Sequence, residues 1–416
     1  MANVERMVEE TPAGQPPVRP DLTLVPGVGG AAGLSLVVFA PHEAEPHLPA
    51  WTRLADAALE PNPFFRPEFL LPYLEGVDHG GRVHVVAVRD GAGACLALLP
   101  VRRGRAGLFM PAACGLAGAY GPLGTPLVDG RLGRDAAVAA LAFLLEGAAG
   151  ACGTRLVALP FLRTDGPVAD MLRAAVQQGN GAFRVAGRSV RAGHATGREG
   201  EAQFAGVRAH RRKELRRLGR RLAEQGPLTV TRIGAGKVDA AAIDAFLDLE
   251  ASGWKGRAGT ALAVEPARAG FARDFLLSLA ARGRLVIDRI ALGDKPVAML
   301  VQIRDGARLH AWKIAHDEAF DAYSPGAQVA RAAMRATLDG AEETGITGAD
   351  SLAIPGHAMI APLWRGEVSC GTGLCSTAQG ARWRVWLGAR DIALEGRARA
   401  LARRLRDALR RRRGAR

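Results

Sequence analysis

The sequence predicts an α/β (α+β) protein built from two similar halves, each with a mixed, mostly antiparallel sheet flanked by helices. The chain has 416 residues, of which 48% are hydrophobic, so it is long enough for two domains that each bury a core. The order of the expected elements also recurs at a separation of about 200 residues, which indicates an internal repeat. In both halves, antiparallel strands lead into a loop, a helix and a further strand.

The repeat begins with a β-hairpin in each half. In both halves a Phe-Leu-Leu motif is followed by a Gly-Arg pair that opens an apolar strand, and a turn of Asp and Gly returns the chain. We therefore expect the halves to superpose, with their first hairpin strands in equivalent places. The paired segments are, in chain order, 83–89 with 94–101 and 285–292 with 297–303.

A helix and a strand follow each hairpin. The first half has an Ala-rich helix over 136–147 and a strand over 155–159. In the second half, apolar residues recur at helical spacing between 330 and 341, opposite a charged face, and the strand 349–354 follows. The polar, glycine-containing segment 187–200 between the halves has no periodicity and is interpreted as a linker.

The two ends of the chain differ from its middle. Residues 1–33 combine Pro, Gly and Glu and predict a disordered leader. Domains are then expected over 34–190 and 191–390. Residues 391–416 predict a basic amphipathic helix and tail. This helix either docks on an anionic membrane or on RNA, or packs on the domain with its arginines in water, and the second interpretation is favoured.

The charge of the chain favours anionic partners. Lys and Arg number 55 against 41 acidic residues, a net charge of +14, which suits a phosphorylated cofactor, RNA or a lipid surface. The same excess also follows from a composition rich in Ala, Gly and Arg. The five scattered cysteines, the lack of a signal peptide and the lack of a long apolar run indicate a cytoplasmic protein. No metal-binding, serine-esterase or nucleotide-hydrolase motif occurs, so no metal is expected.

Several segments of the second half resemble a known family. From 207 to 350 the chain resembles the acetyltransferase domain of CelD (BcsL)-type proteins, distant relatives of the FemAB peptidyltransferases. The first half is similar more weakly, through NPFFRPEFLLPYL and YGPLGTPLVD. The segments that carry the resemblance in the second half are RAHRRKELRRLGRRLAEQG, FLDLEASGWKGRAGTAL, DKPVAML, WKIAHDEAFDAYSPG and ADSLAIPGHAMIAPLWRGE.

The resemblance implies two tandem GNAT-like domains and transfer of an acyl group. The donor would be acyl-CoA, such as acetyl-CoA, and the acceptor an amine or hydroxyl of a small molecule, a sugar or a cell-envelope or polysaccharide precursor. Two alternatives stay open: a FemAB-like ligase that uses aminoacyl-tRNA, and a non-catalytic accessory protein of polysaccharide synthesis. The latter would dock through the Arg-rich tail at the inner face of the membrane, and tRNA ranks behind acyl-CoA as a partner.

Three titratable residues are candidates for catalysis. Lys313 is a lone lysine in the expected strand 307–314, where strict alternation places it on the face of Leu309 and Ala311. Glu250, at the end of a helical run, is a candidate general base. Asp350 lies at the strand that follows the helix of the second half, where titratable groups of α/β sites gather.

A loop before this helix is a candidate phosphate site. A glycine at a helix start lets a phosphate approach the backbone N–H groups and the positive end of the helix dipole. Alternatively, the loop binds no phosphate and is only a helix start capped by its serine. The two interpretations have equal weight. Replacing the glycine with valine is expected to reduce donor binding while folding survives. The residues of this candidate cofactor site are Tyr323, Ser324, Gly326, Ala327 and Gln328.

Other residues are candidates for substrate binding. Basic residues of the segment 208–221 suit phosphates of substrate or donor. Trp254 and Lys255 lie in a glycine-rich segment, and Trp312 neighbours Lys313. We expect Lys313, Glu250 and Trp254 to line one cleft between the domains. The candidates for substrate binding are Arg211, Lys213, Arg217, Trp254, Lys255 and Trp312.

Overall fold

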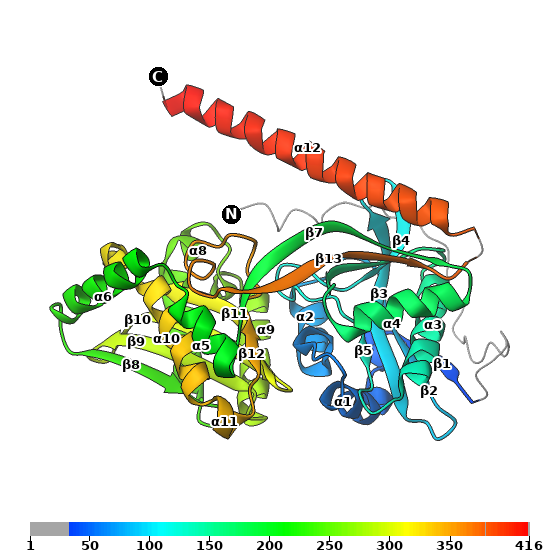
Figure 1. Cartoon of the computed structure of the whole chain (residues 1–416), viewed down its shortest axis with the longest axis horizontal. Helices are drawn as coiled ribbons and strands as arrows, with labels where there is room; N and C mark the ends of the chain where they lie inside the picture. The colour runs from blue at the N-terminus through cyan, green and yellow to red at the C-terminus, as the bar shows by residue number, and fades with distance from the viewer. Residues whose placement is uncertain (1–32, 379, 415–416) are drawn as a thin grey trace. The chain divides into compact units, whose positions relative to one another are not determined.

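The computed structural model describes residues 33–378 and 380–414, which form two compact units (Figure 1). Of the described residues, the N-terminal unit contains 33–65, 81–189 and those from 369 to 414. The central unit contains residues 66–80 and 190–368. The leader expected over 1–33 lies almost entirely outside the described residues.

The N-terminal unit contains a sheet in the order β1-β2-β3-β4-β6-β13. All of these neighbours are antiparallel except β4 and β6, which are parallel. Its helix α3 packs against β1, β2 and β3. The elements are β1 (Ser35–Phe39), η2 (Pro41–Glu43), η3 (Glu45–His47), α1 (Leu48–Asp56), η4 (Pro63–Phe65), β2 (Val83–Arg89), β3 (Cys95–Ala106), β4 (Met110–Gly115), β5 (Leu127–Val128), α3 (Arg134–Ala151), β6 (Val157–Arg163), α4 (Pro167–Gln178) and α12 (Arg382–Gly414).

The central unit contains a sheet in the order β8-β9-β10-β11-β12-β7. Only β11 and β12 are parallel. The elements are α2 (Pro67–Gly76), α5 (Gly197–Ala205), α6 (Ala209–Ala223), β8 (Leu228–Ile233), α7 (Ala240–Ser252), α8 (Trp254–Arg257), η5 (Leu262–Val264), α9 (Pro266–Ala281), β9 (Leu285–Leu292), β10 (Lys295–Asp305), β11 (Arg308–His316), η6 (Glu318–Tyr323), α10 (Pro325–Asp339), α11 (Ala341–Thr344) and β12 (Gly348–Asp350). The strands β7 (Ala182–Ala195) and β13 (Gly366–Ser376) have residues in both units.

The two units repeat one topology. In each, four antiparallel strands are followed by a helix and by a strand parallel to the fourth, with a last antiparallel strand beside it. The strands β2 and β9 occupy equivalent places, with the bounds that the sequence predicts. In the second hairpin, Gly293 takes φ +56° in the two-residue turn, a conformation that glycine adopts without strain.

The units exchange elements along the chain. The strand next to β12 is β7, from the first half of the sequence, and the strand next to β6 is β13, from the second half. Helix α2 also belongs to the central unit, where Phe69 lies edge-on to Phe271 and Phe275 of α9. The division therefore differs from the contiguous domains 34–190 and 191–390, because strand pairing and ring packing decide it.

The linker expected over 187–200 is wrong. Residues up to Ala195 belong to strand β7, and helix α5 begins at Gly197. Residues 193–195 pair with β12, so backbone hydrogen bonds determine the structure of a segment whose side chains lack periodicity.

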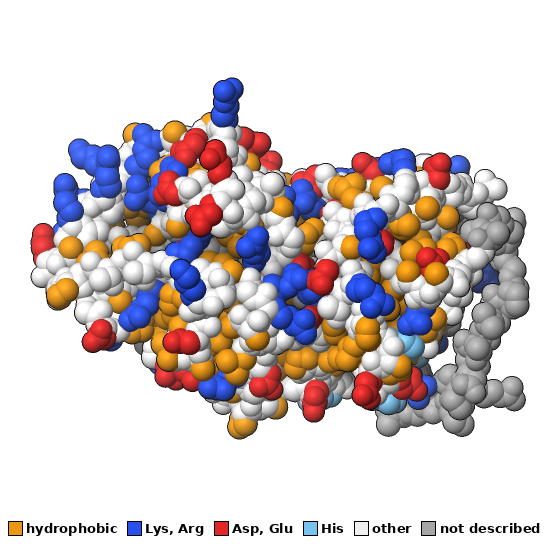
Figure 2. All heavy atoms as spheres, turned by 90° about the horizontal axis from the view of Figure 1, so that it is seen from below, with side chains coloured by type: hydrophobic (Ala, Val, Ile, Leu, Met, Phe, Trp, Pro, Cys, Tyr) orange, Lys and Arg blue, Asp and Glu red, His pale blue; other side chains and the backbone are white. Residues whose placement is uncertain are grey.

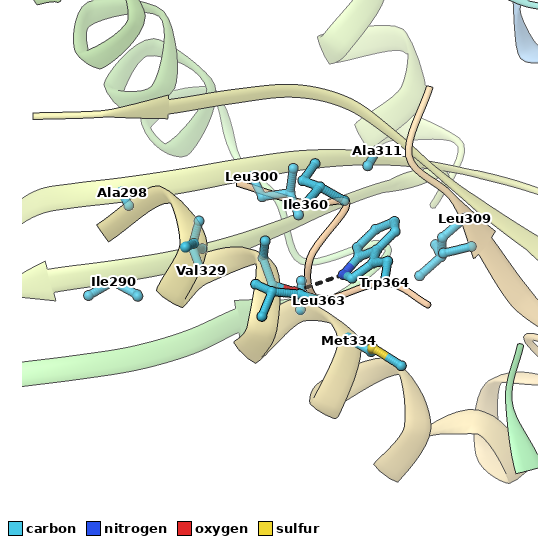
Figure 3. Packing of buried hydrophobic residues seen from close by; sticks show 14 of the residues in the cluster. Ile290, Ala298, Leu300, Leu309, Ala311, Val329, Met334, Ile360, Leu363 and Trp364 are labelled. Carbon is cyan, nitrogen blue, oxygen red and sulfur yellow. Dashed lines mark hydrogen bonds between the residues drawn. The ribbon is translucent and has the colours of Figure 1, made fainter. Parts of the chain in front are cut away.

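The core on one face of the central sheet surrounds helix α10 (Figure 3). Val329, Met334 and their neighbours pack on strands β9 to β11, and α6 contributes Leu215 and Leu222. Trp364 belongs to the segment between β12 and β13 and donates from Nε1 to the carbonyl oxygen of Ala330 at 3.0 Å. This hydrogen bond holds the segment 351–365 against α10.

Helices α7 and α9 pack on other side chains of the same strands. Trp312 of β11 is buried against the ring of Phe275, with centroids 5.3 Å apart, whereas Leu309 and Ala311 pack with α10. The helices in the described part of the chain include none with the length and apolar character that crossing a membrane requires.

Candidate active site

A buried ion pair joins the end of α7 to the short helix α8. Glu250 is 2% exposed, and its Oε1 accepts a hydrogen bond from Nζ of Lys255 at 2.7 Å. Its Oε2 accepts from the backbone N–H of Leu262 at 3.0 Å. Nζ of Lys255 also donates to the carbonyl oxygen of Ile314 on β11, at 3.0 Å. The ammonium group of Lys255 therefore connects α7 to the candidate strand.

A β-bulge directs Lys313 toward this pair. Val301 pairs with Lys313 but Gln302 pairs with Ala311, so Trp312 is an extra residue on β11. The predicted alternation is consequently wrong: Ile314, not Lys313, packs with the Leu309 and Ala311 core. Nζ of Lys313 lies 5.7 Å from the centroid of the Trp312 ring.

The positive charges of Lys255 and Lys313 both act on the carboxylate of Glu250. Burial alone would raise the pKa of Glu250, but the ammonium groups of Lys255 and Lys313, with the hydrogen bonds, outweigh it and lower the pKa. Glu250 is thus an ionised carboxylate and a weak base. This geometry favours a positioning role for Glu250 over the general-base role expected from the sequence.

His357 adds an imidazole to this cluster. It lies in the segment between β12 and β13, and burial followed by the nearby charge of Lys255 lowers its pKa. Within the described residues its Nδ1 is buried and has no hydrogen-bond partner. A neutral imidazole with an available nitrogen is the usual form of a general base. We call Glu250, Lys255, Lys313 and His357 the central cluster.

The two tryptophan candidates have different surroundings. Trp254 is half-buried at the start of α8, and its backbone N–H donates to Oε1 of Glu318. Trp312 is buried in the core beside Phe275, so its proposed contact with substrate is not supported.

Asp350 forms a second buried ion pair. Its Oδ2 accepts from Arg191 at 2.6 Å, and its Oδ1 accepts from the backbone N–H of Leu352 at 2.9 Å. Burial would raise the pKa of Asp350, but Arg191 and His310 outweigh it and lower the pKa. Both carboxylate oxygens are engaged, so the arrangement favours a structural role at the end of β12 over catalysis.

The candidate phosphate loop is the start of α10. Ser324 occupies the N-cap position with φ +51°, and its side chain makes no capping hydrogen bond, because a capping hydroxyl requires an extended backbone. Nε2 of Gln328 donates to the carbonyl oxygen of Tyr323 at 2.7 Å. Pro325 lies at the first helical position, as expected, and Ala327 is buried.

Gly326 is covered by a side chain. A Cβ atom at this position would lie 2.2 Å from Sδ of Met359 and 3.5 Å from Nδ1 of His316. The absence of a side chain at Gly326 therefore accommodates Met359. The expectation that Gly326→Val leaves folding untouched does not fit this packing.

The basic helix α6 lies beside this helix start. It contacts η6 and α10, and a Cβ atom at Gly219 would lie 2.9 Å from Oε1 of Gln328. Arg211 forms an ion pair with Glu214 at 2.8 Å, whereas Lys213 and Arg217 are exposed. Helix α6 thus brings positive charge to the start of α10.

Arg331 and Arg212 line a small, mostly apolar pocket between α5, α6 and α10, and Arg216 lies near Arg331. Arg331 is half-buried with its guanidinium 5.4 Å from the ring centroid of Phe204, and burial and the nearby Arg216 and Arg212 lower its pKa. The lining residues are Phe204, Val207, Arg212, Leu215, Arg331, Met334 and Leu363.

Sequence reasoning did not single out His357 or Arg331. His357 lies in the Pro-Gly-His segment that carries the family resemblance, so a lone histidine in a glycine-containing loop was the available signal. Arg331 appeared on the charged face of its helix, and no sequence signal places it under α6. Basic side chains are in any case spread over the face drawn in Figure 2, interleaved with acidic ones, so charge alone does not locate a site.

Comparison with known proteins agrees with this architecture. Residues 209–354 match the family described as "Acetyltransferase (GNAT) domain". This segment contains Glu250, Lys255, Lys313 and the start of α10, whereas His357 lies three residues beyond it. No curated protein matches the sequence.

Solved structures share the fold at low sequence identity. A crystal structure of FemX has a TM-score of 0.50 at 10% identity, covering 84% of this chain and 99% of that chain. The C-terminal domain of a putative lysylphosphatidylglycerol synthetase from Agrobacterium fabrum has a TM-score of 0.50 at 14% identity, covering 84% and 97%. Residues 209–354 thus match an acetyltransferase (GNAT) domain, and the fold of the chain is similar to that of FemX.

Proposed function

We propose that this protein transfers an acyl group from acyl-CoA to an amine or hydroxyl of a small molecule, a sugar or a cell-envelope precursor. The observation that carries the proposal is the central cluster, in which an available imidazole nitrogen lies near the ammonium group of Lys255, and Lys255 shares the carboxylate of Glu250 with Lys313. Direct transfer needs a base at the acceptor and positive charge near the developing oxyanion.

In this mechanism the acceptor nitrogen or oxygen bonds to the carbonyl carbon of the thioester. Nδ1 of His357 takes the proton of the acceptor, and the ammonium groups of Lys313 and Lys255 stabilise the oxyanion. The C–S bond then breaks, and the departing thiolate takes up a proton. Glu250 holds the two ammonium groups in place and does not itself take the proton.

The charge around α10 supports a phosphorylated donor. Arg212, Arg216 and Arg331 converge where α6 packs against α10, and like charges so placed favour an anion. Phosphate binds guanidinium groups through strong charge-assisted hydrogen bonds. We assign the phosphates of the donor to these three residues, ahead of Arg211, which Glu214 already neutralises.

A second candidate function is ligation with aminoacyl-tRNA as donor. The exposed basic side chains of α6, which include Lys213 and Arg217, extend beyond the pocket and could contact a nucleic-acid backbone. The shared fold with FemX is consistent with this alternative.

Calorimetric titration of the full chain distinguishes the two donors. Acetyl-CoA and longer acyl-CoAs are titrated beside charged tRNA, each at low and high salt. Saturable binding of acyl-CoA with release of CoA in the presence of amine acceptors supports the proposal. Salt-sensitive binding of charged tRNA without binding of any acyl-CoA would select the ligase instead.

A further inference from the structure

Helix α12 carries apolar residues on two opposite faces. On its inner face, Val385, Ala389 and Ile392 pack against the core of the N-terminal unit. Oδ2 of Asp391 accepts backbone hydrogen bonds from Phe109 and Met110, at 2.7 Å each. The inner face and Asp391 therefore account for the attachment of the helix.

The opposite face is apolar and exposed. At about 100° per residue, five side chains of this face fall within an arc of about 40°. Trp386 borders the stripe, and Phe109 of the β3–β4 turn, which is 71% exposed, lies beside Asp391. We call these five residues the outer stripe: Trp383 (53% exposed), Leu387 (40%), Leu394 (48%), Leu401 (58%) and Leu405 (57%).

Positive charge accompanies the stripe. Residues 382–416 hold 13 arginines against three acidic residues, a net charge of +10 out of +14 for the whole chain. Two of the acidic residues are already engaged, since Asp391 binds backbone N–H groups and Glu395 pairs with Arg399. An exposed apolar stripe among arginines resembles the helices that lie in the interface of anionic membranes.

We propose that the outer stripe of α12 binds the surface of an anionic lipid bilayer. Trp383 and the four leucines would enter the boundary between headgroups and acyl chains. The neighbouring arginines, such as Arg390 and Arg397, would contact lipid phosphates while their aliphatic parts remain in the boundary. The helix would lie in the plane of the surface.

A second copy of this chain fits the stripe less well. Leu387, Leu394 and Leu401 recur every seven residues, and in one register of such a seam the alternate positions are Asp391, Ala398 and Leu405, of which Asp391 is already bound to the backbone N–H groups of Phe109 and Met110. In the other register they are Arg390, Arg397 and Arg404. A coiled coil would bury or juxtapose these like charges along the whole interface. A bilayer leaves them at its polar surface.

Nucleic acid also explains the stripe less well than lipid does. Four of the five side chains are leucines, which offer no ring for base stacking. The rings of Trp383 and Trp386 are each covered by a guanidinium, of Arg384 at 4.5 Å and of Arg390 at 4.2 Å. RNA would account for the charge and leave the leucines unexplained.

Co-sedimentation of the full chain with vesicles tests the proposal. One set contains equal parts phosphatidylglycerol and phosphatidylcholine, another phosphatidylcholine alone, and a third arm uses a duplex RNA in a binding assay. The variant Leu394→Ser/Leu401→Ser removes apolar surface at exposed positions without touching the inner face. Val230→Ser, at a 55% exposed residue of β8, is the matched control.

We expect the wild type and Val230→Ser to sediment with the anionic vesicles and the double variant to bind roughly tenfold more weakly or worse. Binding to neutral vesicles should be weak, and salt should reduce binding to the anionic ones. Equal binding of the double variant would overturn the proposal. Binding to RNA without binding to vesicles, or dimerisation lost in the double variant, would also overturn it.

Discussion

Nζ of Lys255 lies 2.7 Å from Oε1 of Glu250, and the carboxylate is almost completely buried. The same ammonium reaches the carbonyl oxygen of Ile314, so the pair holds α7, α8 and β11 together. Lys313 contributes a second positive charge to the same carboxylate. Removing the charge of Glu250 should therefore affect both stability and any chemistry that depends on the two lysines.

The first prediction concerns Glu250→Gln. The amide cannot balance two ammonium groups, so we expect the free energy of unfolding to fall by about 1.5–3 kcal/mol and acyl transfer to fall in the folded variant. Glu265→Gln is the control, because the Glu265 side chain is 58% exposed where it pairs with Arg268, so its loss should change stability less. Urea unfolding measures both variants, and equal stabilities would contradict the role of Glu250.

The second prediction concerns His357. If Nδ1 accepts the proton, His357→Asn should reduce kcat by roughly 10²-fold or more while substrate binding changes little. Because burial and Lys255 lower the pKa of His357, the acidic limb of the wild-type rate profile should lie below the ordinary histidine value of 6.5. The variant should lack this limb. An unchanged profile would assign the base elsewhere.

A third prediction links stability to pH through His194. Its Nδ1 bonds to the carbonyl oxygen of Ala195, its ring lies edge-on to Trp364, and burial, as the largest cause, lowers its pKa from 6.5 to about 4. In the unfolded chain His194 takes up a proton near pH 6.5, whereas in the folded chain it does so only near pH 4. Stability is therefore lost as pH falls from 6.5 toward 4.

The expected loss from His194 is about 3 kcal/mol over this range, since one pKa unit corresponds to about 1.36 kcal/mol. His194→Asn cannot titrate and should lose less stability over the same interval. Chemical unfolding at several pH values, with wild type and variant compared at each, isolates this contribution from the other groups. Parallel curves for the two proteins would count against the prediction.

The sequence predicts the repeat well and the exchange between the units poorly. Strands 83–89 and 285–292 are found with the predicted bounds, because each is an apolar run between a Gly-Arg pair and a turn. The places of α2 and β13 depend on partners hundreds of residues away, such as Asp305, whose Oδ1 lies 3.3 Å from a nitrogen of Arg66. Local patterns carry no information on such pairings.

The site is predictable in part. Glu250, Lys255 and Lys313 are all candidates from the sequence, which also predicts a shared cleft for Lys313 and Glu250. Lys255 bonds directly to Glu250 at the end of α7, and the position of Lys313 depends on the bulge at Trp312. A one-residue insertion in β11 changes which face each later side chain occupies, and alternation cannot show it. His357 enters the cluster through a segment without regular structure, so no periodicity indicates its position.

The fourth prediction concerns the close contact of Gly326 with Met359. Gly326→Ala should destabilise the fold by about 1–3 kcal/mol, because the new Cβ atom would overlap with Sδ of Met359. Gly326→Ala/Met359→Ala should recover part of this loss. The control is Gly270→Ala in α9, where a Cβ atom meets nothing within 4 Å. A double-mutant cycle without coupling would mean that Met359 does not constrain this helix start.

The last prediction separates the two proposed phosphate sites. Arg331→Gln removes a half-buried guanidinium that converges with Arg212 and Arg216, so it should weaken acyl-CoA binding by about 1.5–3 kcal/mol, or roughly ten- to hundredfold. Arg211→Gln should have a smaller effect, because Arg211 is already paired with Glu214.

Arg273→Gln on α9 is the control for these measurements, because it removes an arginine that forms an exposed ion pair with Asp244. Calorimetry gives the three affinities, and circular dichroism checks that each variant is folded. The order Arg331, Arg211, Arg273 in decreasing effect would support phosphate binding between α6 and α10. If Arg211→Gln weakens binding more than Arg331→Gln does, the donor phosphates lie along the outer face of α6, and the converging arginines serve another anion.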